Sequence, residues 1–353
     1  MTDTLALKYG CNPNQAQASI SIEGKLPVKV INGKAGYINF LDALNGYQLV
    51  KELKEATGLC AAASFKHVSP AGAAVAVPLS DKEKKMYFVS SKTELSPLAT
   101  AYIRARGADR MSSFGDFVSL SDVCDASTAH IISLEVSDGV IAPGYTQEAL
   151  EILRSKKGGN YTVIEIDSSY VPQELETRTV YGITFSQMHN NFVPSNKDFE
   201  NIVTKSKKLT DEGKRDLIVA LIALKYTQSN SVAYAKNGQT IGVGAGQQSR
   251  IHCTRLACSI SVLWHVRQSE KVLSLPFKKG VGRNTKDNVI EQYLSSDPEE
   301  NPLEKWEEYF DYKPEPFTDV DRKNCLSNVS EVALASDAFF PFRDNIDRAA
   351  KSG

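Results

Sequence analysis

Apolar residues recur at helical spacing in two separate segments of the chain. Within residues 41–58 the apolar positions fall three or four apart, and Gly58 follows them as a natural C-terminal stop. Residues 215–225 repeat the pattern around a centre that is almost entirely apolar. We therefore expect one helix in each segment, with an apolar face turned toward the core.

A short buried strand is predicted after the first helix. Residues 60–65 are apolar and mostly small, which is typical of a strand packed closely between other elements. Residues 66–72 (KHVSPAG) break this strand, because Pro70 and Gly72 favour turns. The predicted order is therefore helix, strand, and then a polar turn that carries adjacent Lys and His.

A hairpin is predicted after the second helix. The pair Asn237-Gly238 separates the runs 231–236 and 239–243, and this dipeptide is a strong hairpin signal. A helix followed by a polar segment thus occurs twice, which suggests an internal duplication. Alternating helices and strands indicate an α/β or α+β fold. We expect two similar α/β subdomains, about 1–190 and 191–353.

Composition and charge exclude several classes of protein. The 353 residues carry 41 Lys and Arg against 42 Asp and Glu, a net charge of −1, so a general nucleic-acid binder with its basic excess is disfavoured. The longest strongly apolar run, 217–224, is far shorter than the roughly 18 residues of a membrane helix. Six cysteines without a CxxC pair suit reduced thiols. We expect a cytoplasmic protein with no nucleic-acid or membrane partner.

The adjacent pair Lys66-His67 is the first candidate for chemistry. Histidine is the natural general base near neutral pH, and a neighbouring cation favours its neutral, basic form. A surface lysine beside a structural histidine is the alternative interpretation. The position of the pair between a buried strand and a turn favours the functional one.

Two loops could bind an anion. Residues 111–117 combine two serines and a glycine after an arginine, but they could equally form a loop in which Asp116 or Ser119 caps a following helix. Residues 242–250 carry three glycines in G-x-G-x-G spacing and end at Arg250. They could approach a phosphate closely, or simply form the return of a hairpin.

An aromatic cluster near the end of the chain offers a further site. Residues 339–344 hold three phenylalanines, a proline and Asp344, which could form a slot for a planar ring. A core strand that ends in a turn is the alternative. A zinc site is not expected, because His252, Cys253 and Cys258 lack a second closely spaced pair.

Long segments of the chain resemble a known enzyme family. They are KYGCNPNQ (8–15), ASFKHVSPAG (63–72), KYTQSNSV (225–232) and GAGQQSRIHCTR (244–255), supported by 110–125 and 336–347. Together they resemble AICAR transformylase, the formyltransferase half of the bifunctional enzyme that also carries IMP cyclohydrolase. The resemblance covers about residues 7–353. It implies a cytidine-deaminase-like α/β fold with two similar subdomains and no zinc.

The resemblance also implies a reaction in purine synthesis. A formyl group passes from 10-formyltetrahydrofolate to the 5-amino group of AICAR, giving FAICAR and tetrahydrofolate. This weakly nucleophilic amine needs a base and donors that stabilise a tetrahedral oxyanion. By resemblance, His67 is the base, Lys66 is the proton donor or electrostatic stabiliser, and Asn230 positions His67 and the formyl group.

The remaining site residues are implied by the same resemblance. Those expected to bind AICAR are Lys8, Tyr9, Gly115, Asp138, Arg250 and Phe339. Those expected to bind folate are Ile251, Asn288, Pro341, Phe342 and Asp344. Some family members hold potassium, and the matching oxygen-bearing residues are Thr227, Ser229, Ser231 and Asp337. The family forms homodimers with active sites across the interface.

The chain also departs from the family pattern at several positions. Lys8 replaces the usual Arg, and Asn14 replaces the usual His. The chain is expected to be a stand-alone transformylase without the cyclohydrolase domain and without the last few tens of residues of the family. The alternative is a weakened or non-catalytic homologue that binds AICAR-like nucleotides or serves as a dimer scaffold.

Overall fold

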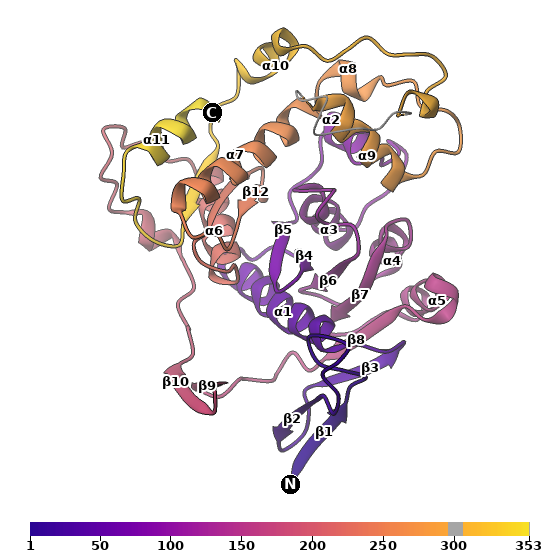
Figure 1. The fold of residues 1–353 in the computed structure, drawn as a ribbon, viewed down its shortest axis with the longest axis vertical. Helices are drawn as coiled ribbons and strands as arrows, with labels where there is room; N and C mark the ends of the chain where they lie inside the picture. Colours follow the sequence, from indigo (N-terminus) through magenta and orange to yellow (C-terminus); the bar gives the residue numbers. More distant parts are fainter. Residues whose placement is uncertain (296–305, 353) are drawn as a thin grey trace.

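A mixed nine-stranded sheet forms the centre of the protein (Figure 1). The structure is a computed structural model that describes residues 1–295 and 306–352. The strands are β1 (Thr2–Ala6), β2 (Ser19–Glu23), β3 (Val28–Asn32), β4 (Ala61–Lys66), β5 (Ser69–Val75), β6 (Asp116–Leu120), β7 (Ser137–Ala142), β8 (Thr162–Ile166), β9 (Leu175–Val180), β10 (Ile183–Met188), β11 (Val232–Lys236), β12 (Gln239–Gly244) and β13 (Ala333–Ser336). The helices in this part of the chain are α1 (Tyr37–Thr57), α2 (Asp81–Met86), α3 (Pro97–Gly107), α4 (Ala126–Ser133), α5 (Gln147–Ser155), α6 (Asp211–Lys225), α7 (Arg250–Val266), α8 (Glu270–Leu273), α9 (Arg283–Leu294), α10 (Asp319–Leu326) and α11 (Asp344–Ala349).

The two predicted helices and the predicted hairpin are confirmed. Helix α1 begins at Tyr37, earlier than expected, and ends before Gly58, whose φ of 70° is the left-handed conformation that glycine tolerates best. Helix α6 covers the second apolar segment. The turn between β11 and β12 places both Asn237 and Gly238 at positive φ, as a tight hairpin requires. The predicted α/β class is confirmed as well.

The predicted turn over residues 66–72 is too long. Only His67 and Val68 form the turn, and Pro70 and Gly72 lie inside β5. The pairing of β5 with β4 shifts register beside Pro70, and such an irregularity accommodates a residue that has no backbone N–H. Gly72 is needed for packing, because a Cβ there would lie 2.0 Å from the carbonyl oxygen of Ala105 in α3.

Several strands begin or end at the same margin of the sheet. The strand order is β13-β11-β12-β5-β4-β6-β7-β8-β3. The turn between β4 and β5 lies at this margin, β6, β7 and β11 begin there, and β12 and β13 end there. We call this margin the turn edge. It is marked by Lys66, Ser69, Asp116, Ser137, Val232, Gly244 and Ser336.

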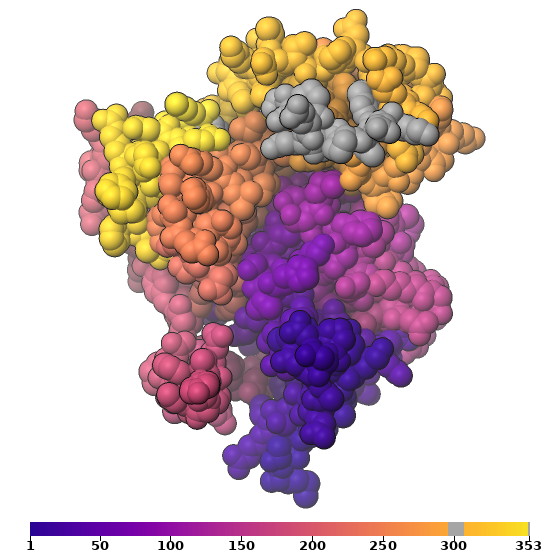
Figure 2. All heavy atoms as spheres, in the orientation of Figure 1, coloured from indigo at the N-terminus to yellow at the C-terminus, as the bar shows by residue number. Residues whose placement is uncertain are grey.

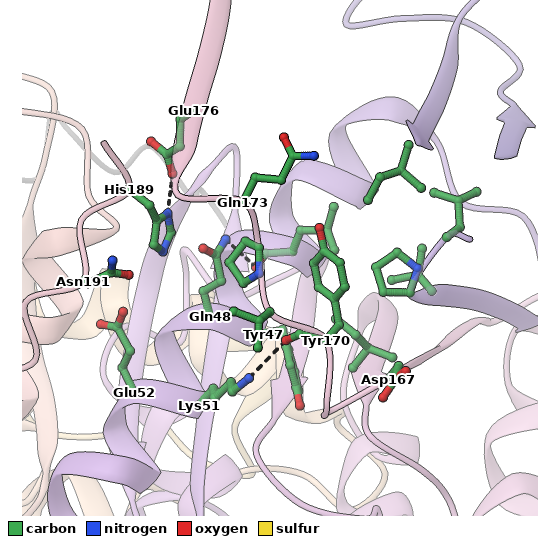
Figure 3. A pocket seen from close by; sticks show the side chains of 18 of the residues that line it. Tyr47, Gln48, Lys51, Glu52, Asp167, Tyr170, Gln173, Glu176, His189 and Asn191 are labelled. Atoms are coloured by element: carbon green, nitrogen blue, oxygen red, sulfur yellow. Dashed lines mark hydrogen bonds and ion pairs between the residues drawn. The ribbon is translucent and has the colours of Figure 1, made fainter. Parts of the chain in front are cut away.

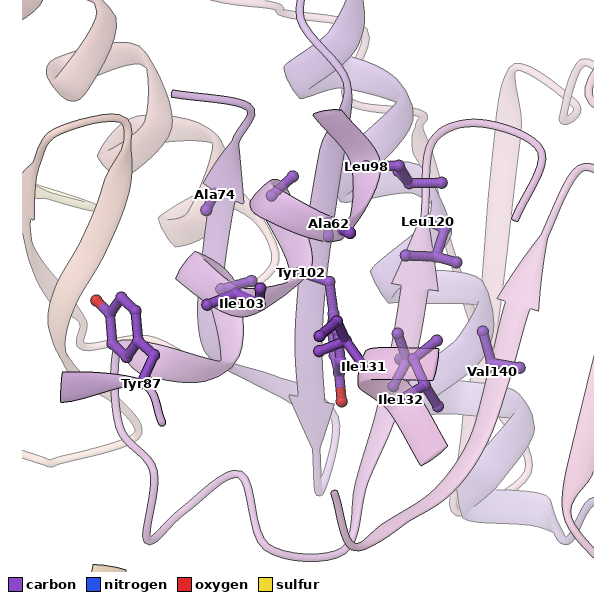
Figure 4. Packing of buried hydrophobic residues seen from close by; sticks show 14 of the residues in the cluster. Ala62, Ala74, Tyr87, Leu98, Tyr102, Ile103, Leu120, Ile131, Ile132 and Val140 are labelled. Carbon is purple, nitrogen blue, oxygen red and sulfur yellow. The ribbon is translucent and has the colours of Figure 1, made fainter. Parts of the chain in front are cut away.

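Helices cover both faces of the sheet. On one face α1 packs against β4 and α6 packs against β5 and β11, around a cluster that contains alternate residues of β4, such as Ala61 and Ala63. On the other face α3, α4 and α7 enclose a second cluster, and Ala62 belongs to that side (Figure 4). Side chains of a strand alternate between the two faces, and this explains how neighbouring alanines serve different cores. All of these alanines are buried, so the small side chains allow both helix layers to approach closely.

The order of elements repeats on the two sides of the sheet centre. In α1-β4-β5-α3-β6, the last strand pairs antiparallel with the first strand of the hairpin. In α6-β11-β12-α7-β13 the last strand does the same. The antiparallel contact of β5 with β12 joins the two units into one sheet. The division into subdomains at about residue 190 stays a prediction.

Two antiparallel ribbons lie outside the central sheet. One is formed by β1 and β2 and the other by β9 and β10, and both protrude from the rest of the molecule (Figure 1 and Figure 2). Every residue of β9 and β10 is exposed. No helix in the described residues is long and apolar enough to cross a membrane.

Candidate functional site

Predicted site residues from distant parts of the sequence meet along the turn edge. Lys66 and His67 lie in the turn itself, and Gly115 and Asp138 lie at the beginnings of β6 and β7. Ser231, Arg250 and Asp337 are linked by hydrogen bonds around the beginning of β11 and the end of β13. The sheet therefore carries two groups of candidate residues on the same margin, one from each half of the chain.

The Lys66-His67 turn is held by contacts from two other elements. Lys66 Nζ donates to the carbonyl oxygen of Phe114 at 2.5 Å, which links the turn to the loop before β6. His67 and Val68 have φ values of 52° and 62°, a left-handed conformation that is rare for residues other than glycine. The N–H of Val68 donates to Asp42 Oδ1 at 2.6 Å, so α1 anchors this unusual backbone.

Asp42 brings a second titratable group to the turn. Its side chain is part of α1 and is only 5% exposed. Burial raises the pKa of Asp42 to about 6, and it outweighs the opposing effects of the Val68 hydrogen bond and the charge of His67. The nearby charge of Asp138 acts in the same direction as burial. Asp42 therefore changes charge near neutral pH directly beneath the His67 backbone.

A buried ion network supports the beginning of β6. Arg106 donates to Asp116 Oδ1 at 2.8 Å and to Glu135 Oε2 at 3.1 Å. Glu135 also pairs with Arg110 and Arg283. Burial alone would raise the pKa of Glu135, but the charges of Arg110, Arg106 and Arg283 hold it at about 2. This permanently charged network fixes the loop that contains Phe114 and Gly115.

The structure rules out the helix-cap interpretation of residues 111–117. The expected helix cap is wrong, because Asp116 and Ser119 lie within β6, and Asp125 caps the helix that follows. Ser113 is fully buried and hydrogen-bonded to Ser64. The segment is therefore a packed turn, and only Gly115, with φ of 78°, keeps the left-handed conformation of an open loop.

The second group centres on the Arg250 guanidinium, which is largely buried. Its Nη2 donates to Asn230 Oδ1 at 2.6 Å, and its Nη1 donates to Ser336 Oγ at 2.9 Å and to Asp337 Oδ1. Burial would raise the pKa of Asp337, but hydrogen bonds from Ser229 and Arg250 lower it below its ordinary value. Arg250 thus orients Asn230, and an incoming phosphate would have to compete with Asp337 for the same donors.

The four residues matched to a potassium site differ in how well they suit a cation. Ser231 Oγ is buried and has no hydrogen-bond partner in the described part of the chain, so a hard cation would satisfy it. Ser229 and Asp337 lie within hydrogen-bonding contact of each other. Thr227 Oγ1 instead donates to the carbonyl oxygen of Ala223 at 2.7 Å. Three of the four side chains therefore fit an oxygen-coordinated ion.

A cavity of about 440 Å³ opens beside the first group. Its lining includes Lys66, Arg110, Phe114, Asn288 and Tyr309. It therefore places Asn288, matched to the folate site, next to Lys66, matched to the catalytic pair. Lys66 brings positive charge and Phe114 an apolar surface, whereas Arg110 is paired with Asp287, which also lines the cavity. Such a combination can hold an anionic molecule with a flat ring.

Other predicted residues lie apart from the turn edge in this chain. Lys8 and Tyr9 follow β1, whose residues Asp3–Leu5 line a cavity together with the ends of β7 and β8 on the opposite margin of the sheet. Lys8 Nζ stacks on the ring of Tyr9 at 5.8 Å. No hydrogen bond or ion pair among the described residues joins this pair to the Lys66-His67 turn.

The aromatic segment lies on the surface beyond β13. Phe339 and Phe342 are 82% and 73% exposed, and Pro341 is exposed as well. The alternative of a core strand is therefore wrong, since β13 ends at Ser336. Asp344 begins α11 and accepts from Asn345 Nδ2 at 2.8 Å. Ile251 is half-buried in the first turn of α7, beside Arg250.

The glycines of residues 242–250 serve packing. A Cβ at Gly242 would lie 2.2 Å from the carbonyl oxygen of Ala257, and one at Gly244 would lie 2.1 Å from that of Cys253. Both glycines belong to β12 and allow α7 to lie against the strand. The interpretation as a phosphate loop is therefore wrong for these two, and the hairpin return is confirmed.

Sequence reasoning missed the residues that support the site. Asp42, Arg106 and Glu135 are buried charged residues that hold the two loops at the turn edge. The only local signal was a carboxylate on the apolar side of a predicted helix, at Asp42. The partners of Arg106 and Glu135 depend on strand order, which the local pattern does not contain.

Comparison with known proteins gives a consistent family. Residues 1–260 match the family described as the AICARFT/IMPCHase bienzyme. The bifunctional purine biosynthesis protein PurH of Oenococcus oeni is 32% identical over 71% of this chain and 46% of its own length. The PurH proteins of Magnetococcus marinus and Leuconostoc citreum are 28% and 32% identical over 98% of this chain, and 52% of each is covered.

The chain spans about half the length of these curated relatives. The family match nevertheless covers most of the chain, including the Lys66-His67 turn, Asn230 and Arg250. By this match the chain belongs to the AICARFT/IMPCHase family.

Proposed function

We propose that this chain transfers a formyl group from 10-formyltetrahydrofolate to the 5-amino group of AICAR, giving FAICAR and tetrahydrofolate in purine synthesis. The observation that carries the proposal is that the Lys66-His67 turn and the Asn230–Arg250 group lie on the same edge of the sheet. The family match and the names of the relatives support the same reaction.

The proposed roles follow from the groups that the turn presents. The amine nitrogen of AICAR attacks the formyl carbon, and the bond from that carbon to folate N10 breaks. His67 is exposed at the turn and takes a proton from the amine. Lys66 lies beside the cavity that contains Asn288 and supplies positive charge and a proton toward N10. Asn230 is oriented by Arg250 and positions the formyl group.

The same proposal assigns the residues that bind AICAR, folate and potassium. Gly115, Asp138, Arg250 and Phe339 contribute to AICAR binding, and Ile251, Asn288, Pro341, Phe342 and Asp344 to folate binding. Potassium is held by Ser229, Ser231 and Asp337, with Thr227 as the fourth matched residue. The oxygen of Ser231 that lacks a partner among the described residues supports this ion.

We further propose that the protein acts as a cytoplasmic homodimer in which Lys8 and Tyr9 serve the active site of the other copy. The arrangement is supported by the position of β1, which precedes them and lies beside the ends of β7 and β8 at the margin opposite the turn edge. The fully exposed ribbon of β9 and β10 supports association too, because an isolated two-stranded ribbon is marginally stable in water.

A tetrahydrofolate-release assay tests the proposed reaction. The purified protein is mixed with AICAR and 10-formyltetrahydrofolate, and turnover is compared for the wild type, His67→Ala and His130→Ala. His130 is exposed on α4 and serves as the matched control. We expect His67→Ala to lower kcat by about 10²–10⁴, the usual contribution of a general base, while His130→Ala leaves it unchanged.

The same assay separates the enzyme from a binding protein. Absence of wild-type turnover would contradict the proposed reaction. Retained AICAR binding, measured by calorimetry, would then favour the binding homologue. Equal turnover in wild type and His67→Ala would leave the reaction standing but would remove His67 from its role as base.

A further inference from the structure

A large cavity lies away from the proposed active site. It has a volume of about 740 Å³, within the range of small-molecule sites (Figure 3). It runs along α1, between β2 and the segment that follows β8. None of its lining residues is among the predicted catalytic, AICAR, folate or potassium residues. The formyl-transfer reaction therefore leaves this cavity without an assigned purpose.

One part of the cavity is apolar and aromatic. Tyr47 and Tyr170 both line the cavity and are labelled near its middle, although Tyr47 is largely buried (Figure 3). The aliphatic residues of the lining are Ile20, Ile22, Leu26, Val28, Leu44, Ile166, Val171 and Val193, with Pro27 and Pro172. This wall suits a ligand with a flat or aliphatic body, since apolar area removed from water favours binding.

The charged part of the lining is acidic. It contains the carboxylates of Glu52, Glu55, Asp167, Glu174 and Glu176. The cations among the lining residues are Lys51 and, when protonated, His189. Lys51 Nζ donates to the carbonyl oxygens of Ser168 and Tyr170 at 3.3 and 3.4 Å, and His189 Nδ1 pairs with Glu176 Oε1 at 2.5 Å. A phosphate or a folate carboxylate would therefore be repelled here.

Glu52 places a carboxylate at one end of the cavity, close to His189 and Asn191 (Figure 3). Its Oε1 accepts from Lys225 Nζ at 2.6 Å and from the Tyr226 hydroxyl at 2.8 Å. Its Oε2 is buried and has no hydrogen-bond partner among the described residues. A carboxylate oxygen with spare acceptor capacity favours a positively charged donor.

We propose that this cavity binds a small organic cation, namely a protonated amine carried on an apolar or aromatic body. The amine lies among the carboxylates near Glu52, and the body lies between Tyr47 and Tyr170. A cation over the face of a tyrosine ring gains further attraction. The proposal is independent of formyl transfer, because the cavity shares no residue with the proposed active site.

Isothermal titration calorimetry with a matched pair of probes tests the proposal. Tryptamine carries an ammonium group on an indole ring, and indole-3-propionate carries a carboxylate on the same ring and chain length. We expect tryptamine to bind one site per chain with a Kd on the order of 10⁻⁴ M, as for a ligand of this size. We expect indole-3-propionate to bind at least tenfold more weakly, since the lining repels anions.

Two variants assign the binding to this cavity. Glu52→Gln removes the carboxylate at the polar end and should weaken tryptamine binding at least tenfold. Gln48→Trp fills the cavity from α1 and should abolish tryptamine binding. If Glu52→Gln fails to fold, Gln48→Trp by itself tests whether the binding occurs in this cavity. The control is Glu148→Gln, an exposed carboxylate on α5 outside the cavity, which should leave the Kd unchanged.

Three results would overturn the proposal. The first is the absence of saturable tryptamine binding, or equal binding of indole-3-propionate. The second is tryptamine binding that neither cavity variant affects. The third is sedimentation data in which Gln48→Trp converts a dimer into a monomer, because the cavity would then be an interface between copies. None of these measurements uses tetrahydrofolate release, so they test the cavity independently of formyl transfer.

Discussion

At the scale of single residues, the Lys66-His67 turn adopts a backbone conformation that is unfavourable for the residues that form it. His67 and the β-branched Val68 both adopt positive φ, and the turn is stable only because other residues hold it. The Asp42 carboxylate accepts a hydrogen bond from the Val68 N–H, and the Phe114 carbonyl oxygen accepts one from the Lys66 ammonium. These hydrogen bonds explain how the exposed side chains of the turn keep a defined geometry.

The stability conferred by Asp42 should fall as pH rises. Its pKa of about 6 in the fold lies above the ordinary value of 3.8, so between these values the folded state binds more protons than the unfolded one. The free energy of unfolding therefore decreases through this window, by about 3 kcal/mol at most. Asp42→Asn cannot ionise and keeps an acceptor for Val68, so its stability relative to wild type should rise by about 1–3 kcal/mol between pH 4 and pH 7.

Urea unfolding of both proteins at the two pH values measures this difference. A constant difference between wild type and Asp42→Asn would show that Asp42 keeps an ordinary carboxyl pKa. The variant should also lower kcat, because Asn donates as well as accepts and holds the Val68 N–H less firmly.

Glu135 should show the opposite dependence on pH. Its pKa of about 2 lies below the ordinary 4.5, so its contribution is complete above about pH 4.5 and is lost as pH falls toward 2. Glu135→Gln leaves buried arginines without their shared carboxylate and should cost about 3–5 kcal/mol at pH 7. The cost should shrink at pH 3. Urea unfolding measures both, with Glu148→Gln on α5 as an exposed control that changes stability by less than about 0.5 kcal/mol.

At the scale of elements, local signals predicted what each segment forms but not where it lies. The apolar spacing of α1 and α6 and the Asn237-Gly238 turn were sufficient, because helices and tight hairpins are decided by neighbours in sequence. Resemblance supplied the identities of the candidate residues. The meeting of the Lys66 turn with Arg250 could not be read locally, because it depends on the antiparallel contact of β5 with β12.

The glycines of β12 show how a local interpretation can fail. The sequence around Gly242 allows either a phosphate loop or a hairpin return, and α7 lies so close that a Cβ would meet the Ala257 carbonyl oxygen at 2.2 Å. Gly242→Ala should therefore lower the free energy of unfolding by about 1–3 kcal/mol through overpacking. The folded fraction should bind AICAR with unchanged affinity.

Denaturant unfolding and calorimetry test the two parts separately. Gly144→Ala is the matched control, because its nearest neighbour beyond the adjacent residues, a methyl group of Val123, would lie at an ordinary 3.5 Å. A loss of AICAR affinity without a loss of stability in Gly242→Ala would restore the phosphate-loop interpretation.

At the scale of the whole molecule, no hydrogen bond or ion pair among the described residues joins Lys8 and Tyr9 to the other proposed site residues. The turn edge gathers Lys66, His67, Asn230 and Arg250, whereas Lys8 and Tyr9 follow a ribbon near the opposite margin. Exposed phenylalanines at 339 and 342 also lack a covering layer among the described residues. A two-fold dimer in which the margin beside β1 of one copy lies against the turn edge of the other would account for both features.

Mixing two inactive variants tests this arrangement directly. Tyr9→Ala removes the ribbon residue and His67→Ala removes the proposed base, so each homodimer should have two defective sites. If sites are shared between copies, a heterodimer holds one doubly altered site and one intact site. Random exchange of subunits makes half of the dimers mixed, so activity should return to about a quarter of the wild-type value.

The control is His67→Ala mixed with His67→Ala/Tyr9→Ala, a combination in which no intact site can form and no activity should appear. Exchange is confirmed by native mass spectrometry of the mixture, so that a failure to exchange is recognised before activity is compared. If mixed dimers of Tyr9→Ala and His67→Ala form and remain inactive, Tyr9 acts within its own chain. The ribbon of β1 and β2 would then have to fold over to the turn edge when AICAR binds.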